Sequence, residues 1–361
     1  MIPSGMIGLV SFSVALLASL TLTIPVRQFA LRVGMVDQPG HRKIHVQPIP
    51  LLGGIAIYAA VLLAMLVSWS HGEALAQVLA ILAGATLVVT TGTLDDRGLL
   101  HHQIKLFGAM PIAACILLAS GIHAQVFTLF WPGPAGSVAD AVLTVFWVTG
   151  ITASFSILDY MDGLCAGVAA VASLFFAFLA ALHGQIWVST LAAAVMGAAL
   201  GFLRWNFNPA RIFMGDGGAM LLGFLMATLS LKLRVTGTSL PAEIFAPALV
   251  LGATIFDTTL VSISRSRRGL LPFTTPGKDH TAHRLSNLGL GTRRAVLCMY
   301  ALGCVFGLLA LLVGRLESRQ AFFAMAVIVV AVLLGVAALE QAPYERQQRK
   351  TNAEPKPQPA D

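Results

Sequence analysis

The chain has 361 residues, of which 57% are hydrophobic and only 11% are charged, and its mean hydropathy is +0.82. This composition is far too apolar for a soluble globular domain. The formal net charge of +7 does not require a nucleic-acid partner, because the basic residues are distributed as in the loops of a membrane protein.

Apolar stretches recur along the chain, and each is long enough to cross a hydrocarbon core of about 30 Å as a helix. We predict an all-α, polytopic membrane helix bundle with about eleven transmembrane helices. Ten is the alternative count, since span boundaries are hard to place from sequence. The expected spans are 5–26, 53–69, 74–94, 103–120, 141–158, 164–182, 187–203, 217–234, 242–264, 294–314 and 321–340.

The spans are expected to form one integral membrane domain over residues 1–340. The polar, Pro-containing segment 341–361 is predicted to be a disordered cytoplasmic tail. The first span is not a cleaved signal peptide, because no Lys or Arg precedes Arg27.

The basic residues instead follow the first span, so the positive-inside rule places the N-terminus outside and the 27–52 loop in the cytoplasm. Carried through eleven spans, this orientation puts 19 of the 23 Lys and Arg residues on the cytoplasmic side. The four on the outer side are Lys232, Arg234, Arg315 and Arg319.

Acidic residues gather on the cytoplasmic side of this topology. Apart from the C-terminal tail, eight of the sixteen come to this face from six separate segments: Asp37, Asp95, Asp96, Asp159, Asp162, Asp216, Asp257 and Asp279. A single acid at a helix end often only solvates a turn, but that explanation predicts no preference for one face. Clustered carboxylates at a membrane boundary are costly, so we interpret them as holding a divalent cation or handling protons. Mg²⁺ binds one or two carboxylates plus substrate phosphates, so not all eight can be ligands.

Two cytoplasmic loops carry groups that suit phosphate. The segment "DQPGHRKIHVQPIPLLGG" contains Arg42, Lys43 and His45 before paired glycines at a helix start, and the late loop contains His280, His283 and Arg284. Guanidinium, ammonium and helix N-termini all bind phosphate oxygens. Taken alone, a basic pair beside a membrane is more often a topology signal, and a loop histidine usually has no special role.

Three classes of function remain to be weighed. A membrane enzyme that moves a phosphorylated group needs its cation and its basic groups at the cytoplasmic boundary. A secondary transporter usually has its site near the bilayer midplane, on broken helices, whereas here only Asp257 is partly embedded. A non-catalytic scaffold leaves the clustered charges unexplained. The positions of the acids therefore favour the enzyme.

The motifs resemble those of the polyprenyl-phosphate N-acetylhexosamine-1-phosphate transferases, the bacterial enzymes that start O-antigen and teichoic-acid synthesis and their peptidoglycan relative. The resemblance runs over about residues 5–340. It rests on five segments in family order: "DQPGHRKIH…PIPLLGG", "LDDR", "LDYMDGL", "FLRWNFNPARIFMGDGG" and "GKDHTAHRLSNLGL".

The resemblance implies that a UDP-N-acetylhexosamine and polyprenyl (undecaprenyl) phosphate give a polyprenyl-diphospho-sugar and UMP, with Mg²⁺ or Mn²⁺. GlcNAc is the family's usual sugar, and another UDP-N-acetylhexosamine stays open. The implied place is the bacterial cytoplasmic (inner) membrane, with the active site at its cytoplasmic face, in the synthesis of cell-envelope polysaccharide. A homodimer is left open.

Site residues follow from the resemblance alone. Catalytic roles are implied for Asp95, Asp96, Asp159 and Asp162. Metal ligation is implied for Asp216 and for Ser156. Substrate contacts are implied for Arg42, Lys43, His45, Asn206, Phe213, His280, His283 and Arg284. The role of Asp257, in "FDT", is not defined by the resemblance.

The chain departs from the family pattern at three places. Ser156 stands where the family usually has an Asn that can ligate metal, and Ala282 stands where some members have a third histidine. Gly217, Gly218 and Ala219 replace the more usual small residue and Gly-Ser pair. A Ser hydroxyl is shorter and a poorer ligand than an amide carbonyl. These departures leave open an altered substrate or a weakly active member.

Overall fold

The computed structural model describes residues 4–38, 47–68, 74–100, 102–235, 239–271 and 277–344. In these ranges the chain is almost entirely helical, and the two strands they contain, β1 (Val36–Asp37) and β2 (Ile49–Pro50), form one short antiparallel pair. The all-α prediction is confirmed.

The first half of the chain contains the α-helices α1 (Ser4–Arg32), α2 (Gly53–Val67), α3 (Leu75–Asp96), α4 (His102–Ile104), α5 (Met110–Ala119), α6 (Pro134–Leu158), α7 (Leu164–Leu182) and α8 (Ile186–Asn206). The second half contains α9 (Gly215–Lys232), α10 (Leu240–Val250), α11 (Gly252–Arg267), α12 (Thr281–Leu285), α13 (Gly291–Val313) and α14 (Ser318–Glu340). Short π-helical turns, η1 (Lys105–Ala109) and η3 (Ser286–Leu290), and a 3₁₀ turn, η2 (Phe127–Leu129), lie between them.

Each of the eleven expected spans coincides with a helix or with two or three consecutive helical elements. Seven helices in the described ranges are long and apolar enough to cross a bilayer, or eight if α10 and α11, bent by 72° at Leu251, count as one span. The helices α2 and η1–α5 are shorter, and α9 carries a charged residue at each end. The protein is thus a multi-pass membrane protein, while the exact count of eleven stays a prediction.

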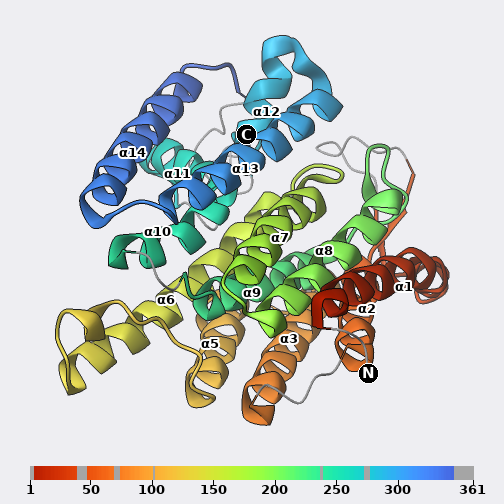
Figure 1. Ribbon diagram of the computed structural model, residues 1–361. Coiled ribbons are helices and arrows are strands. Elements are labelled where there is room, and N and C mark those ends of the chain that lie inside the picture. Colours follow the sequence, from red (N-terminus) through yellow and green to blue (C-terminus); the bar gives the residue numbers. More distant parts are fainter. Residues whose placement is uncertain are drawn as a thin grey trace, which may run out of the picture.

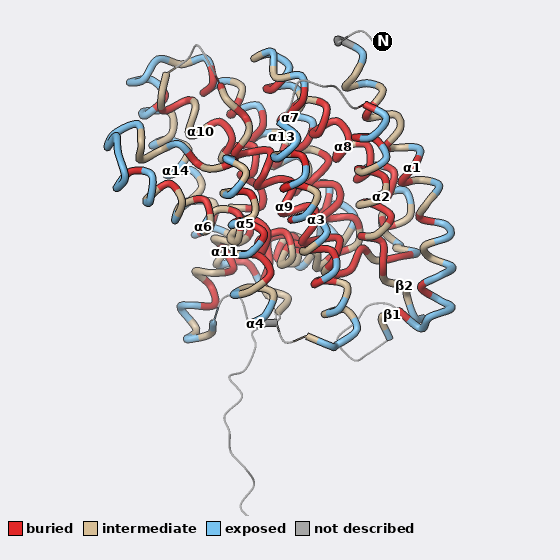
Figure 2. The backbone as a smooth tube through the Cα atoms, turned by 90° about the horizontal axis from the view of Figure 1, so that it is seen from below, coloured by how far each residue is buried: buried red, intermediate tan, exposed pale blue. Residues whose placement is uncertain are grey.

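Helix α9 forms the centre of the bundle. Almost all of its residues are buried, and it packs against α2, α3, α6, α7 and α8. Figure 1 shows α7, α8 and α9 in the middle, with α1 and α2 on one side and α10–α14 on the other. Figure 2 shows the buried backbone concentrated in these central helices, while α1 and α14 present exposed outer faces. Exposed apolar side chains such as Phe323 and Leu334 on α14 suit a helix surrounded by lipid.

Glycines set how closely α2 and α3 approach α9. A Cβ added at Gly54 would collide with the backbone of Gly218, and one added at Gly92 would collide with the backbone of Gly217. Small residues allow membrane helices this close contact. Because Gly217 follows Asp216 directly, the two crossings bring the end of α3 and the start of α2 beside the start of α9.

Candidate active site

The end of α3 and the start of α9 share a cluster of charged side chains. Lys105, in η1, places its Nζ 2.6 Å from Asp95 Oδ2 and also contacts Asp216 Oδ2. Within the described parts of the chain, Lys105 makes both of the ion pairs found in this cluster. Ion pairs that are partly withdrawn from water hold their geometry better than exposed ones, so Lys105 fixes the two carboxylates relative to each other.

The side chain of Asp96 supports the same cluster by binding the backbone of Asp216. Its Oδ1 accepts a hydrogen bond of 3.0 Å from the Asp216 N–H, in the first turn of α9. A carboxylate at a helix N-terminus satisfies free N–H groups and interacts favourably with the helix dipole. Gly215, with φ of 70°, lies so close to Asp96 that a Cβ there would collide with the carboxylate. The glycine before Asp216 is therefore required by the approach of Asp96.

The turn between α6 and α7 brings two more acids. Asp159 follows the last residue of α6, and Gly163, with φ of 78°, precedes α7. Burial, together with the charges of Asp216, Asp96 and Asp162, raises the pKa of Asp159 to about 8. These carboxylates are therefore near enough to repel one another when no cation lies between them.

Asp162 and Asn206 hold this turn to the segment that leads into α9. Asp162 Oδ2 accepts hydrogen bonds from Asn208 Nδ2 and Ala210 N, both at 3.0 Å. Buried Asn206 accepts from Gly163 N and donates to Ile212 O, also at 3.0 Å. Both ends of the Asn206 amide are thus bonded to backbone and hold the α6–α7 turn to the segment before α9, and the substrate contact expected of Asn206 stays a prediction.

The acids of this cluster suit a Mg²⁺ ion that is bound together with substrate. Within the described residues, no three His, Cys, Asp or Glu side chains are arranged so that they alone could hold a metal ion. Mg²⁺, however, usually takes one or two carboxylates and completes its shell with water and substrate phosphates. Asp216, which accepts a 3.2 Å hydrogen bond from Ser156 Oγ, and nearby Asp159 offer such a set. The uncompensated negative charge around Asp159 fits a cation that arrives with its substrate.

A second polar cluster lies on the other side of the α6–α7 turn. The ring of Tyr160 stacks on His280 with 4.0 Å between centroids, and its hydroxyl donates to Asp257 Oδ1 at 3.3 Å. Asp257 Oδ2 lies 2.9 Å from His280 Nδ1, and His283 lies 4.8 Å from the Tyr160 ring. Asp257 therefore fixes the imidazole of His280. Because Tyr160 follows Asp159 directly, one turn touches both clusters.

Asp279 and Arg284 anchor the helix that carries these histidines. Burial alone would raise the pKa of Asp279, but hydrogen bonds and charge from Arg265, with Arg268, hold that pKa at about 2. Fully buried Arg284 donates to Asp279 O and Leu339 O, both at 2.8 Å, and pairs with Glu340 at 3.0 Å.

The ring of Tyr344 lies 4.0 Å from the Arg284 guanidinium. Arg284 thus ties α12 to the end of α14. Tyr344, in the expected tail, takes part in this anchor, and residues 345–361 lie outside the described ranges.

The remaining predicted residues divide into two groups. Half-buried Phe213 lies three residues before Asp216, and its backbone pairs with Pro50 O and Gly53 N, which places the end of the first cytoplasmic loop beside the acids. Arg42, Lys43 and His45 lie outside the described residues.

Sequence reasoning missed Lys105 and Tyr160. Lys105 falls inside the expected span 103–120 and follows the paired acids by nine or ten residues. Tyr160 lies between two of the predicted acids in "LDYMDGL", and the sequence pattern gives it no role. A lone lysine beside an apolar span that follows paired acids is a usable signal for such a partner.

Fold and site together define the class of the protein: a multi-pass membrane protein with one acidic, lysine-bridged site at the ends of its helices. Residues 78–234 match glycosyl transferase family 4. The chain is 33% identical, over 90% of its length and 89% of the relative's, to a probable undecaprenyl-phosphate N-acetylglucosaminyl 1-phosphate transferase of Bacillus subtilis.

Two further relatives carry similar names. A decaprenyl-phosphate N-acetylglucosaminephosphotransferase of Mycolicibacterium smegmatis is 32% identical, over 76% of this chain and 74% of the relative. An undecaprenyl-phosphate alpha-N-acetylglucosaminyl 1-phosphate transferase of Yersinia pestis is 26% identical, over 88% and 87%. The chain belongs to the polyprenyl-phosphate N-acetylglucosamine-1-phosphate transferase family, as the motifs indicated.

Proposed function

We propose that the protein transfers N-acetylglucosamine-1-phosphate from UDP-N-acetylglucosamine to undecaprenyl or another polyprenyl phosphate and releases UMP. The relatives' names support the acceptor lipid and the sugar phosphate. The observation that carries the proposal is the Asp95–Lys105–Asp216 cluster at the end of the helix bundle. A water-soluble nucleotide sugar and a lipid phosphate at headgroup level can meet at such a place.

Chemically, an oxygen of the lipid phosphate attacks the β-phosphorus of the nucleotide sugar. A new P–O bond forms, the bond from that phosphorus to the bridging oxygen breaks, and its electron pair leaves with UMP. The attacking phosphate is already largely ionised near pH 7, so we assign the side chains to charge neutralisation and alignment. A direct displacement needs no covalent intermediate on the protein.

Each group has a proposed part in this step. Lys105 offsets charge on the phosphates, and Asp95 holds its ammonium in place. Asp216 with Ser156, and Asp159 beside them, would hold Mg²⁺, which when bound neutralises the diphosphate. Asp96 fixes the start of α9. His280 and His283, positioned by Asp257 and Tyr160, form the neighbouring wall that faces the sugar diphosphate. Phe213 is assigned to the uracil.

The proposal includes an orientation. The acidic end of the bundle lies at the cytoplasmic face of the bacterial inner membrane, the N-terminus lies outside, and the chain crosses the bilayer eleven times. Figure 2 supports this geometry in part, because β1, β2 and α4 lie at one end of the bundle while α1 begins at the other. The excess of basic residues in the loops at the acidic end favours the cytoplasm for that end.

The direct test uses the purified protein with undecaprenyl phosphate, Mg²⁺ and a panel of UDP-sugars, followed by mass spectrometry of the lipids. We expect the GlcNAc-diphospho-lipid to form, and we expect UMP with Mg²⁺ to regenerate the nucleotide sugar from it. A product with another N-acetylhexosamine would change the sugar but keep the reaction. If no sugar is transferred and no UMP-dependent release occurs with any divalent cation, the proposal is wrong.

Ser156 gives a prediction about the metal. Ser156→Asn should lower the Mg²⁺ concentration for half-maximal activity, since an amide carbonyl is a longer and better ligand, and Ser156→Ala should raise it. The expected change is about tenfold in each direction, the lower end of what groups around a metal usually contribute. The measurement is a Mg²⁺ titration of initial rate at saturating nucleotide sugar. Identical titrations for all three proteins would remove Ser156 from the metal site.

A further inference from the structure

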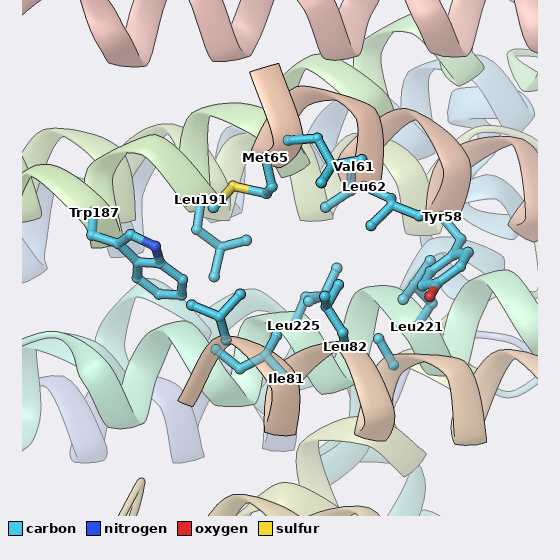
Figure 3. A pocket seen from close by; sticks show the side chains of 13 residues that line it. Tyr58, Val61, Leu62, Met65, Ile81, Leu82, Trp187, Leu191, Leu221 and Leu225 are labelled. Atoms are coloured by element: carbon cyan, nitrogen blue, oxygen red, sulfur yellow. The ribbon is translucent and has the colours of Figure 1, made fainter. Parts of the chain in front are cut away.

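A hollow lies between α2, α3, α8 and α9, in the half of the bundle away from the acids. Its empty volume is about 530 Å³ including the open mouth, and its lining includes Leu62, Met65, Leu82, Trp187, Leu191 and Leu225. Figure 3 shows Trp187 at one end and Tyr58 at the other, with the aliphatic side chains between them. The Tyr58 hydroxyl is paired with Thr86 Oγ1 at 2.7 Å, so the hollow offers almost no polar group.

The hollow follows from how α2 and α3 are attached. Both touch α9 through glycines near the acidic end, but they make few contacts with each other. Beyond the crossings a gap is left between them. Leu63 and Leu79, 43% and 54% exposed, flank it on the outer surface of the bundle, which faces the bilayer. An apolar cavity of this kind does not hold water stably, so hydrocarbon from the membrane is its natural occupant.

A positive charge stands at the end of the hollow farthest from the acids. Lys232, the last residue of α9, places its Nζ 4.5 Å from the Trp187 ring centroid and 2.7 Å from Gln77 Oε1. It is one of the four basic residues that the positive-inside rule assigns to the outer side. Trp and Lys side chains are typical of the level where hydrocarbon meets headgroups. The site therefore combines a hydrocarbon pocket with a cation at headgroup level.

We propose that this hollow binds one acyl chain of an anionic phospholipid whose phosphate lies beside Lys232, in the leaflet opposite the acidic site. The helix geometry separates this lipid from the acceptor substrate. Lys232 follows Asp216 by sixteen positions in α9, which is about 24 Å along the axis. A lipid phosphate reacting at Asp216 cannot also bind at Lys232. The site is independent of the proposed reaction.

The test is native mass spectrometry of the full chain, delipidated and titrated with phosphatidylglycerol or with phosphatidylcholine of the same acyl chains. We expect one phosphatidylglycerol to be retained per chain, more strongly than phosphatidylcholine. Leu62→Trp fills the hollow and should weaken retention about tenfold, which corresponds to losing the burial of about two methylene groups. Leu334→Trp, at an exposed position of α14 away from the hollow, is the control and should retain lipid as the wild type does.

Lys232→Gln should keep the chain site but reduce the preference for phosphatidylglycerol about fivefold, as expected for one cation near an anionic headgroup. Arg315→Gln, an exposed cation at the same end of the bundle, is its control. Leu82→Trp fills the hollow from α3 and replaces Leu62→Trp if that variant does not fold. Equal retention by the filled and control variants, no preference between headgroups, or one-for-one displacement by polyprenyl phosphate would each overturn the proposal.

Discussion

Replacing Lys105 by Met should reduce sugar-phosphate transfer by about 10²–10³-fold, the usual effect of removing one group that stabilises developing charge in a water-poor site. Lys105 makes both ion pairs described for the cluster, with Asp95 and Asp216. Without it, the two carboxylates and the incoming phosphates would repel each other. The measurement is the initial rate with UDP-N-acetylglucosamine and undecaprenyl phosphate, and Arg315→Met, at the opposite end of the bundle, serves as the control.

Lys105→Met also has an effect on stability that must be separated from catalysis. Leaving partners of a buried ion pair unpaired costs roughly 3–5 kcal/mol at full burial, and less here because the Asp216 side chain is 30% exposed. The double variant Lys105→Met, Asp95→Asn removes one of the stranded charges. We expect it to recover most of the thermal stability but none of the activity. Recovery of both would mean that Lys105 is only structural.

The fold could be predicted from the sequence because hydrocarbon imposes one strong rule, that a spanning segment must satisfy its own backbone as a helix. Every expected span therefore has a helical counterpart. What hydropathy does not reveal is how these helices break and bend. The 72° bend at Leu251 and the π-helical turn that carries Lys105 depend on packing between segments far apart in sequence.

For the site, sequence placed the acids at helix ends but could not say which of them meet. Asp95, Asp96 and Asp216 are held together by contacts across about 120 residues, which depend on glycine crossings that a single sequence does not reveal. Motif similarity also treats neighbouring residues alike. His280 and Arg284 lie in one motif, yet His280 is held against Asp257 and Tyr160, while the contacts of Arg284 run to α14. The roles of individual residues follow from their partners rather than from the motif.

Replacing Asp216 by Asn should abolish transfer, with a loss of about 10³-fold or more, while the protein still folds and inserts. The amide is nearly the same size as the carboxylate and can still accept the hydrogen bond from Ser156. It has no charge, so it neither pairs with Lys105 nor holds Mg²⁺ as a carboxylate does. Raising the Mg²⁺ concentration should recover little activity.

The matched control for Asp216→Asn is Asp140→Asn, the same change at a buried acid near the opposite end of the bundle. Asp140 accepts hydrogen bonds from the backbone N–H groups of Val126, Phe127 and Thr128 at 2.7–3.1 Å. Loss of the Asp140 carboxylate should lower the thermal unfolding temperature. It should leave the rate per folded molecule within about twofold, since substitutions at distant sites with no shared partners usually act independently. Near-normal turnover by purified Asp216→Asn protein would show that the carboxylate cluster is not the reaction centre.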